Sequence, residues 1–302
     1  MQAAVIGIGS NSVRVLVARN QDGVFERMYR DREGTRLFAG LDSCHMLKEE
    51  SILKTAEAVR RMTAAARKTG AEDLSIFATS AARDAANGEE LLQAIEEASG
   101  IPPAILSGEE EARLSFFGAS RAVKDECYCG VTDIGGGSTE IVTGCGDKVE
   151  CAFSCQMGAV RLFREITIAR KEDMASVEKA AREILEKKLA EQGEFRRPEI
   201  WIGTGGTFTT MAAMVKEIPW TARTHMHGTR VTKDEIRRIG EKLAGMPLEE
   251  RIRLPGLQPG RADIVVHGIC ILLAVMDRFE IKAITVSEWG NLDGYLWKKL
   301  MQ

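Results

Sequence analysis

The feature that most constrains the fold of this chain is a pattern that occurs twice. Residues 5–17 read VIGIGSNSVRVLV, and residues 131–143 read VTDIGGGSTEIVT. Each is an apolar strand, a turn of Gly and Ser residues, and a second strand, which together predict a β-hairpin. One such hairpin in each half of a 302-residue chain indicates a duplicated domain. A duplicated domain usually binds its ligand between the two copies.

Strands alternate with helices in both halves, which indicates an α/β layered architecture. The first half predicts, in order, a strand ending near Tyr29, a helix over 47–68, a strand over 74–78, a helix over 89–98 and a strand over 104–106. The second half predicts a helix over 171–190, strands over 199–202 and 283–286, and a terminal helix. We expect domain I over 1–122, completed by 289–302, and domain II over 123–288.

Composition excludes several classes of protein. The net charge is −3, so the overall field does not favour nucleic acid, and any polyanion must be held by local groups. No apolar run reaches the roughly 20 residues of a membrane helix, and no signal peptide is evident. The seven cysteines are scattered without zinc-type spacing, which favours structural thiols. We therefore expect a cytoplasmic protein that binds neither membranes nor nucleic acid.

Three glycine-rich turns follow apolar strands, at 7–12, 135–138 and 203–207. Glycine lets the backbone approach a ligand and expose successive N–H groups, which suits phosphate oxygens. Each turn alone could equally be a tight structural turn, and none has a Walker or Rossmann pattern. Because two of the three occur at matching places of the repeat, phosphate binding is the favoured interpretation.

Two carboxylates flank the second turn. Asp133 precedes it, and Glu140 lies on the strand that leaves it, on the same face as Ser138. Two carboxylates beside a phosphate-binding turn suit Mg²⁺, which takes oxygen ligands and shares its shell with substrate phosphates. The alternative is a turn-capping Asp and a solvated strand Glu.

The segment 107–113, SGEEEAR, predicts a helix opened by a capping box of Ser107 and Glu110. Glu109 then complements the helix dipole. From these residues alone, Glu111 is interpreted as surface charge rather than as a general base.

Two arginines have positions suited to phosphate. Arg83 is expected in a loop at the end of a strand, and Arg261 is expected to open a helix. Either side chain could bind phosphate or merely pair with a neighbouring Asp.

Taken together, these segments resemble the exopolyphosphatase / guanosine pentaphosphate phosphatase (Ppx/GppA) family of the sugar kinase–Hsp70–actin superfamily. The motifs that carry the resemblance are GSNS at 9–12, RL at 36–37, TSAAR at 79–83, SGEEEAR at 107–113, DIGGGSTE at 133–140, GTGGT at 203–207 and RAD at 261–263. The resemblance implies two actin-like (ribonuclease H-like) domains with a cleft between them. It also implies Mg²⁺-dependent release of the terminal phosphate of inorganic polyphosphate, or of the 5′ γ-phosphate of pppGpp.

The resemblance assigns roles to individual residues. Glu111 becomes the catalytic base, which reverses its interpretation as surface charge, and Asp133 with Glu140 become the metal-binding acids. The phosphate-binding residues implied are Asn11, Arg83, Gly135, Gly136, Gly137, Ser138, Gly205, Gly206, Thr207 and Arg261. Related proteins often form homodimers, which we also expect here.

The chain departs from the family pattern at two positions. Gly7 stands where the first turn usually begins with an acid, and Asp293 stands where an arginine is usual. Because an acid at position 7 would help to hold Mg²⁺, its loss allows an alternative function. The chain would then be a catalytically weak or inactive sensor that binds (p)ppGpp or polyphosphate. A kinase of the same superfamily is a weaker alternative, because fold alone does not decide chemistry.

Overall fold

The computed structural model describes residues 1–42, 44–123, 127–193, 195–222 and 225–301. The chain divides into two compact units. Unit 1 comprises Met1–Gly118 and Asn291–Gln302, and unit 2 comprises Ala119–Gly290. The chain thus passes between units at 118/119 and 290/291, where the sequence analysis expected 122/123 and 288/289. Each unit contains one copy of the repeated hairpin.

Unit 1 is built on one sheet with helices along it. Its elements are β1 (Gln2–Ile8), β2 (Val13–Gln21), β3 (Val24–Glu33), η1 (Leu37–Gly40), α1 (Glu49–Lys68), β4 (Asp73–Ala78), α2 (Ser80–Asp84), α3 (Gly88–Ser99), β5 (Ala104–Ile105), α4 (Gly108–Ala119) and α11 (Asn291–Met301). The strand order is β3-β2-β1-β4-β5. The hairpin strands are antiparallel, whereas β4 runs parallel to β1 and β5 parallel to β4.

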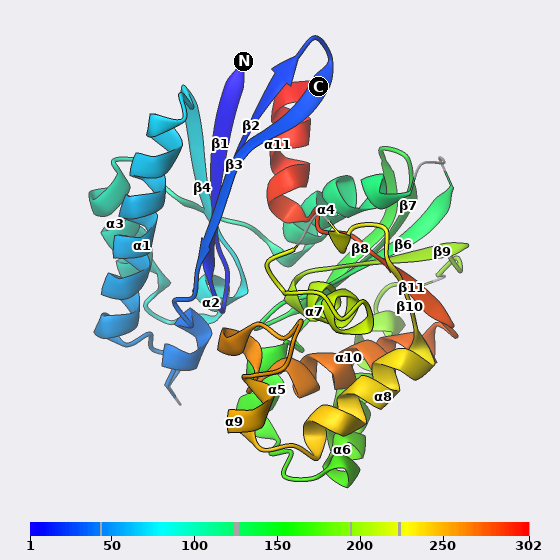
Figure 1. The fold of residues 1–302 in the computed structure, drawn as a ribbon. Coiled ribbons are helices and arrows are strands. Elements are labelled where there is room, and N and C mark those ends of the chain that lie inside the picture. Colours follow the sequence, from blue (N-terminus) through cyan, green and yellow to red (C-terminus); the bar gives the residue numbers. More distant parts are fainter. Residues whose placement is uncertain (43, 124–126, 194, 223–224, 302) are drawn as a thin grey trace. The chain divides into compact units, whose positions relative to one another are not determined.

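Strand β1 is covered on both faces. Helices α1 and α3 lie on one side of the sheet, and α11 lies on the other (Figure 1). A strand buried on both faces needs an almost continuous apolar run, which is what Ala3 to Ile8 supply. The residues packed under α11 form one cluster: Ala3, Val5, Leu16, Ala18, Phe77, Leu292, Leu296 and Leu300. The C-terminal helix therefore completes the core of unit 1.

Unit 2 is also built on one sheet that begins with the hairpin, and it has more helices and strands than unit 1. The elements of unit 2 are η2 (Ser120–Ala122), β6 (Tyr128–Ile134), β7 (Thr139–Cys145), β8 (Lys148–Cys155), α5 (Ala159–Glu165), η3 (Lys171–Asp173), α6 (Met174–Ala190), β9 (Ile200–Thr204), α7 (Gly206–Val215), β10 (Arg230–Thr232), α8 (Lys233–Ala244), α9 (Leu248–Arg251), η5 (Pro259–Arg261), α10 (Val265–Arg278) and β11 (Ala283–Val286). The strand order is β10-β11-β9-β6-β7-β8. Again the hairpin is antiparallel, and β9 runs parallel to the first hairpin strand.

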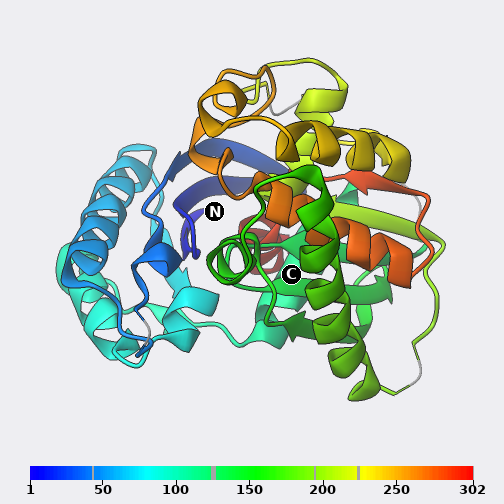
Figure 2. The same ribbon diagram turned by 90° about the horizontal axis from the view of Figure 1, so that it is seen from below.

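Helix α10 is the centre of the core of unit 2. Every residue from Val265 to Met276 is buried, as expected of a helix that is apolar on all sides. Helices α6 and α8 pack against it, and Figure 2 shows these three helices, in green, yellow and orange, lying together. Helix α10 also contacts β6 and α7, the helix that follows β9.

The two-sheet α/β architecture confirms the expected fold class, with the repeated hairpin as the first element of each sheet. Some local predictions were wrong. Strand β3 continues to Glu33 rather than ending near Tyr29, and β10 was not expected. Both pair along edges of their sheets, where partner strands rather than local pattern decide the length. None of the helices in the part of the chain that the structure describes is long and apolar enough to cross a bilayer.

Candidate active site

The turns of the two hairpins are closed by the same backbone hydrogen bond. In the first, the amide of Gly9 donates to the carbonyl of Ser12 at 3.0 Å. In the second, the amide of Gly135 donates to the carbonyl of Ser138, also at 3.0 Å. The repeat that the sequence indicates is therefore a repeat of structure, and the two turns can be compared atom by atom.

The first turn is held firmly from two sides. The Ser10 hydroxyl is hydrogen-bonded to that of Ser80 at 2.8 Å, and the amide of Arg36 donates to the carbonyl of Asn11 at 3.1 Å. Asn11 itself is buried, and its side-chain carbonyl Oδ1 has no hydrogen-bond partner among the described residues. Because a buried polar atom normally has a partner, Asn11 fits a residue that contacts a ligand or an ordered water.

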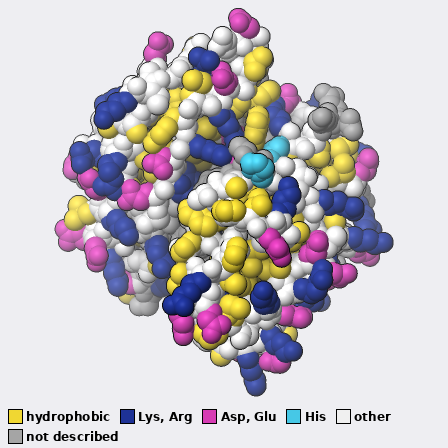
Figure 3. Space-filling model, viewed as in Figure 1, with side chains coloured by type: hydrophobic (Ala, Val, Ile, Leu, Met, Phe, Trp, Pro, Cys, Tyr) yellow, Lys and Arg dark blue, Asp and Glu magenta, His cyan; other side chains and the backbone are white. Residues whose placement is uncertain are grey.

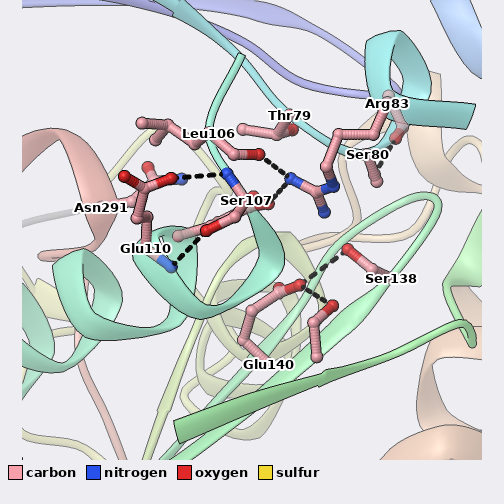
Figure 4. Close-up of polar contacts among 12 residues, drawn as sticks. Thr79, Ser80, Arg83, Leu106, Ser107, Glu110, Ser138, Glu140 and Asn291 are labelled. Carbon is pink, nitrogen blue, oxygen red and sulfur yellow. Dashed lines mark hydrogen bonds and ion pairs between the residues drawn. The ribbon is translucent and has the colours of Figure 1, made fainter.

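Arg83 does not lie in a loop, as the sequence analysis expected, but on the short helix α2 directly after β4. The alanines at 81 and 82 favour helix, and the amide of Arg83 donates to the carbonyl of Thr79 at 3.1 Å. The guanidinium Nη1 donates to the carbonyl of Leu106 at 2.7 Å (Figure 4). It also donates to Glu111 Oε2 at 3.0 Å. The other terminal nitrogen, Nη2, is buried and has no hydrogen-bond partner among the described residues.

Glu111 is buried, with 7% of its surface exposed, so its interpretation as surface charge from local sequence was wrong. The predicted capping box is confirmed. The Ser107 amide donates to Glu110 Oε2 at 2.8 Å, and the Glu110 amide donates to Ser107 Oγ at 3.2 Å. Exposed Glu109 pairs with Arg113 on the same helix at 2.8 Å. Of the three consecutive glutamates, only Glu111 therefore turns inward, to Arg83.

In the second hairpin, the two acids are direct neighbours. Asp133 on β6 is paired in register with Glu140 on β7, so both side chains lie on the same face, about 5 Å apart at Cβ. They are 8% and 1% exposed. Like charges directly opposite each other on a sheet are destabilising. Burial increases that cost, and a bound cation would offset it.

Two serines orient Glu140. Ser138 Oγ donates to Glu140 Oε1 at 2.7 Å, and Ser154 Oγ donates to the same oxygen at 2.8 Å (Figure 4). The shared face of Ser138 and Glu140 was expected from strand periodicity. Ser154 was missed, because it lies on β8 and only the register Glu140–Ser154 reveals it. Burial and the Glu140 carboxylate raise the pKa of the neighbouring Cys155 thiol to about 12, so without a bound metal this thiol is protonated at neutral pH.

The donor set decides which metal would fit. No group of three or more His, Cys, Asp or Glu side chains lies close enough together to hold a metal among the described residues. Two carboxylates with hydroxyls nearby suit Mg²⁺, which keeps several waters and binds through one or two carboxylates plus substrate phosphates.

The turn at 135–138 presents its amides. Its carbonyls accept hydrogen bonds from the start of α5: Gly135 O from Ala159 N at 3.0 Å and Gly136 O from Val160 N at 2.9 Å. Nothing in the described part of the chain accepts a hydrogen bond from the amides of Gly136 and Gly137. Consecutive free amides bind anions. Gly158 makes this packing possible, because a Cβ there would lie 2.3 Å from Gly136 O.

The start of α7 forms the other part of this site. Gly205 has φ +94°, and a Cβ on it would lie 2.6 Å from Asp133 Oδ1, so only glycine permits this approach. A Cβ on Gly206 would lie 2.2 Å from Arg261 Nη2, which places the guanidinium against the first turn of α7. The Thr207 side chain lies against Gly268 of α10. The backbone amide of Thr207, which lies in the first turn of α7, is thus the group of this residue that is suited to an anion.

The sequence analysis expected Arg261 to open a helix, but it does not. It lies in η5, and α10 begins only at Val265. The proline and glycine before it favour a tight turn over an α-helical start. The turn nevertheless brings its guanidinium to Gly206, next to Gly205 and the Asp133 carboxylate.

Position 7 of the first hairpin is packed with apolar atoms. Gly7 is the register equivalent of Asp133, but a Cβ on it would lie 2.8 Å from Leu292 Cδ1 and 3.2 Å from Phe77 Cε2. The residue across from Gly7 is Arg14, where the second hairpin has Glu140. The first hairpin therefore lacks both acids, and a side chain at position 7 would require Leu292 and Phe77 to shift.

Comparison with known proteins gives consistent matches. A model described as the Ppx/GppA phosphatase family matches residues 16–302. A solved Ppx/GppA family member from Aquifex aeolicus is 30% identical, with a TM-score of 0.82 over 99% of this chain and 97% of that one. A solved exopolyphosphatase-like protein is 28% identical, with a TM-score of 0.89 over 99% and 98%. An exopolyphosphatase from Cytophaga hutchinsonii, 24% identical with a TM-score of 0.86 over 99% and 97%, shares the fold.

Proposed function

The chain belongs to the Ppx/GppA phosphatase family, and we propose that it releases the terminal phosphate of inorganic polyphosphate or the 5′ γ-phosphate of pppGpp. The observation that carries the proposal is the buried pair of Glu111 and Arg83, in which a carboxylate is fixed beside a guanidinium with a free buried nitrogen. Buried ionisable groups with defined partners are typical of active sites.

In the proposed reaction, Glu111 orients a water molecule and accepts its proton. The water oxygen forms a bond to the terminal phosphorus, and the anhydride P–O bond breaks on the opposite side. The bridging oxygen leaves with the electron pair, on the shortened polyphosphate or on pppGpp's remaining nucleotide. The hydrogen bonds of Arg83 to Leu106 and Glu111 hold the carboxylate and guanidinium in place, so little reorganisation is needed.

Phosphate oxygens need donors as charge develops in the transition state. On unit 1 the candidates are Arg83 Nη2 and the Gly9–Ser12 turn with Asn11. On unit 2 they are the free amides of Gly136 and Gly137, and the start of α7 with Arg261. We expect variants of these candidates, on either unit, to reduce turnover.

We propose Mg²⁺ as the cofactor. Asp133 and Glu140 would hold it, with Ser138 and Ser154 fixing the orientation of Glu140. When bound, the ion would neutralise charge on the substrate phosphates. The supporting observation is the pair of buried carboxylates in register, with two serine hydroxyls donating to one oxygen of Glu140.

A second function is favoured by one observation. The position of the usual acid in the first hairpin is filled by Leu292 and Phe77, so any metal contact that this acid makes in relatives is lost. The chain would then bind polyphosphate or (p)ppGpp and turn it over weakly or not at all, acting as a sensor.

The decisive experiment measures phosphate release from long polyphosphate, short polyphosphate and pppGpp, with Mg²⁺ and with EDTA. Wild type is compared with Glu111→Gln, which should lose at least ~10²-fold in rate, the usual size of a general-base effect. Glu109→Gln is the matched control, because it removes the same charge from the same helix at an exposed position. Circular dichroism checks that both variants fold.

Mg²⁺-dependent release that is lost only in Glu111→Gln supports the hydrolase and ranks its substrates. Near-normal turnover in Glu111→Gln removes that residue from the role of base. Binding without release from any substrate supports the sensor instead.

A further inference from the structure

Unit 2 contains a pocket that the proposed reaction does not use. Its volume is about 550 Å³, which is within the range of pockets that hold small molecules. Its wall includes Leu189 and Ala190 at the end of α6, Phe279 directly after α10, and Phe195 and Arg197 before β9. None of these residues has a role in the reaction proposed above.

Strand β9 and helix α10 separate this pocket from the phosphate-binding turns. Strand β9 begins next to the pocket and ends at Thr204, beside the third glycine-rich turn. Helix α10 lies against Thr207 at Gly268, near its start, and reaches the pocket at its last residue, Arg278. The rise along the helix from Gly268 to Arg278 is about 15 Å. The pocket is therefore a separate site rather than an extension of the phosphate-binding one.

The apolar wall of the pocket is a stack of aromatic rings. The ring centroids of Phe195 and Phe279 are 4.8 Å apart at an interplanar angle of 29°, and those of Phe279 and Trp201 are 4.8 Å apart at 30°. Trp201 and Phe279 are buried, whereas Phe195 is half-buried at the pocket. Aromatic ligands stack on aromatic side chains of this kind. The wall therefore favours a flat aromatic ligand.

The rim of the pocket is charged but locally neutral. Arg278 pairs with Glu186 at 2.7 Å, and Arg197 pairs with Glu280. These side chains supply donors and acceptors to the edge of a ligand, and their two positive and two negative charges cancel. Figure 3 shows basic and acidic side chains interspersed on the face that it displays, and the net charge of the chain is −3. No positive field therefore attracts a polyanion to this pocket.

The backbone at Glu280 shows that the rim is held in place. Glu280 follows the end of α10 with φ +52°, the left-handed conformation for which a helix C-terminus usually has glycine. The side chain that glycine would lack pairs with Arg197. Arg197 Nη2 also donates to the Glu280 carbonyl at 3.3 Å. These two contacts together fix the Arg197 guanidinium at the rim.

We propose that this pocket binds an uncharged, flat aromatic compound with hydrogen-bonding groups at its edge, the chemistry of a purine nucleoside. The ring would stack on Phe195, and its edge would meet the guanidinium and carboxylate groups of the rim. This inference goes beyond the proposed function and does not depend on it, because the two sites share no residue.

The probes are guanosine and adenosine, which carry a flat ring with a polar edge and no charge. Isothermal calorimetry on the whole chain measures their dissociation constants. We expect at least one of them to bind wild type with a Kd of about 1 mM or tighter.

Two variants locate the binding. Ala190→Trp fills the pocket from an exposed position of α6 and should weaken nucleoside binding at least ~10-fold. Lys187→Trp is the matched control, because it adds the same ring to the same helix at an exposed position that does not line the pocket. Phe195→Ala removes the stacking ring and should weaken binding about tenfold, whereas Phe195→Tyr should keep it. Thermal unfolding checks that each variant folds.

Nucleoside binding that Ala190→Trp and Phe195→Ala both weaken, and that Lys187→Trp leaves unchanged, supports the inference. Binding that survives in either of the first two variants, or an equal loss in Lys187→Trp, places the nucleoside elsewhere and overturns it. The absence of binding to wild type at about 1 mM overturns it as well. Failure of the proposed function is distinguishable, because it would appear as no phosphate release from any substrate and would leave these affinities unchanged.

Discussion

The two hairpins of this chain share the hydrogen bond that closes the turn but differ in the charged residues beside it. Both turns close with the same 3.0 Å hydrogen bond between the first Gly and the Ser three residues later. Yet the register pair that flanks each turn is Asp133 with Glu140 in unit 2 and Gly7 with Arg14 in unit 1. One turn is flanked by two carboxylates and the other by a guanidinium.

The difference shows what duplication conserves. The turn geometry depends on Gly and Ser residues that can adopt it, and those recur in both copies. The flanking pair points away from the backbone bonds that define the hairpin, so it can change without altering the fold. We infer that the second hairpin is suited to a cation and the first to anions. Glu140→Gln and Gly7→Asp test this contrast directly. Three further experiments compare the starts of helices α7 and α4, and all five are given from the largest expected effect to the smallest.

Glu140→Gln should abolish the metal dependence of the second hairpin. We expect Mg²⁺-dependent phosphate release to fall at least ~10²-fold, because a preorganised charge at the reacting phosphate is lost. Arg14→Gln, at the equivalent register position, should change substrate affinity and leave the Mg²⁺ requirement intact. Initial rates over a Mg²⁺ titration measure both. Equal Mg²⁺ curves for wild type and Glu140→Gln would contradict the assignment of this residue.

Gly7→Asp, which makes the first hairpin resemble the second, should destabilise the protein by about 3 kcal/mol rather than create a metal site. The new carboxylate would be forced against Leu292 and Phe77. Urea unfolding measures the loss. The double variant Gly7→Asp with Leu292→Ala makes room and should recover part of it. A single variant as stable as wild type would show that the packing at position 7 is not a barrier.

Gly205→Ala should cost about 2 kcal/mol of stability and reduce turnover, because it combines a positive φ with a contact on Asp133. Gly23→Ala is the matched control: its φ is +81°, and nothing lies within 4 Å of the added Cβ. The difference between the two variants in urea unfolding measures the contact together with the extended backbone of Gly205, which has φ 94° and ψ −179°. Identical losses would mean that backbone strain alone explains the requirement for glycine.

The helix starts offer the smallest test. α4 is capped by Ser107, whereas α7 has no side-chain cap. Ser107→Ala should therefore cost about 1 kcal/mol in the absence of any ligand. Differential scanning calorimetry measures it, with Ser120→Ala outside the cap as the control. A cap that contributes nothing would weaken this contrast between the two helices.

The pH dependence of the cap has a defined sign. Hydrogen bonds from the backbone and side chain of Ser107 lower the pKa of Glu110 below its ordinary value of 4.5. A carboxyl group with a lowered folded-state pKa stabilises the fold above the unfolded-state value, and this stabilisation is lost as the pH falls through the folded-state value. Glu110→Gln should thus destabilise the protein at neutral pH and make no difference in acid below that range. An unchanged difference in acid would contradict it.

Local sequence determined a large part of this structure. The repeated apolar strand and Gly-Ser turn specify the hairpins because alternation and turn chemistry are local properties. The Ser107–Glu110 cap follows from a spacing of three residues, and the closeness of Ser138 to Glu140 follows from strand periodicity. In each case the interacting groups lie within a few residues of one another. The family was identified from the resemblance of the whole set of motifs, because no single motif is sufficient to assign it.

Tertiary structure decided the rest. Glu111 turns inward because Arg83 and the carbonyl of Leu106 lie beside it, and those groups come from separate segments. Ser154 reaches Glu140, and Arg32 lies opposite Arg14, only through strand register. The space beside Gly7 is occupied by the side chain of Leu292, which lies near the C-terminal end of the chain. Contacts between distant segments depend on how elements pack, and no local pattern encodes them.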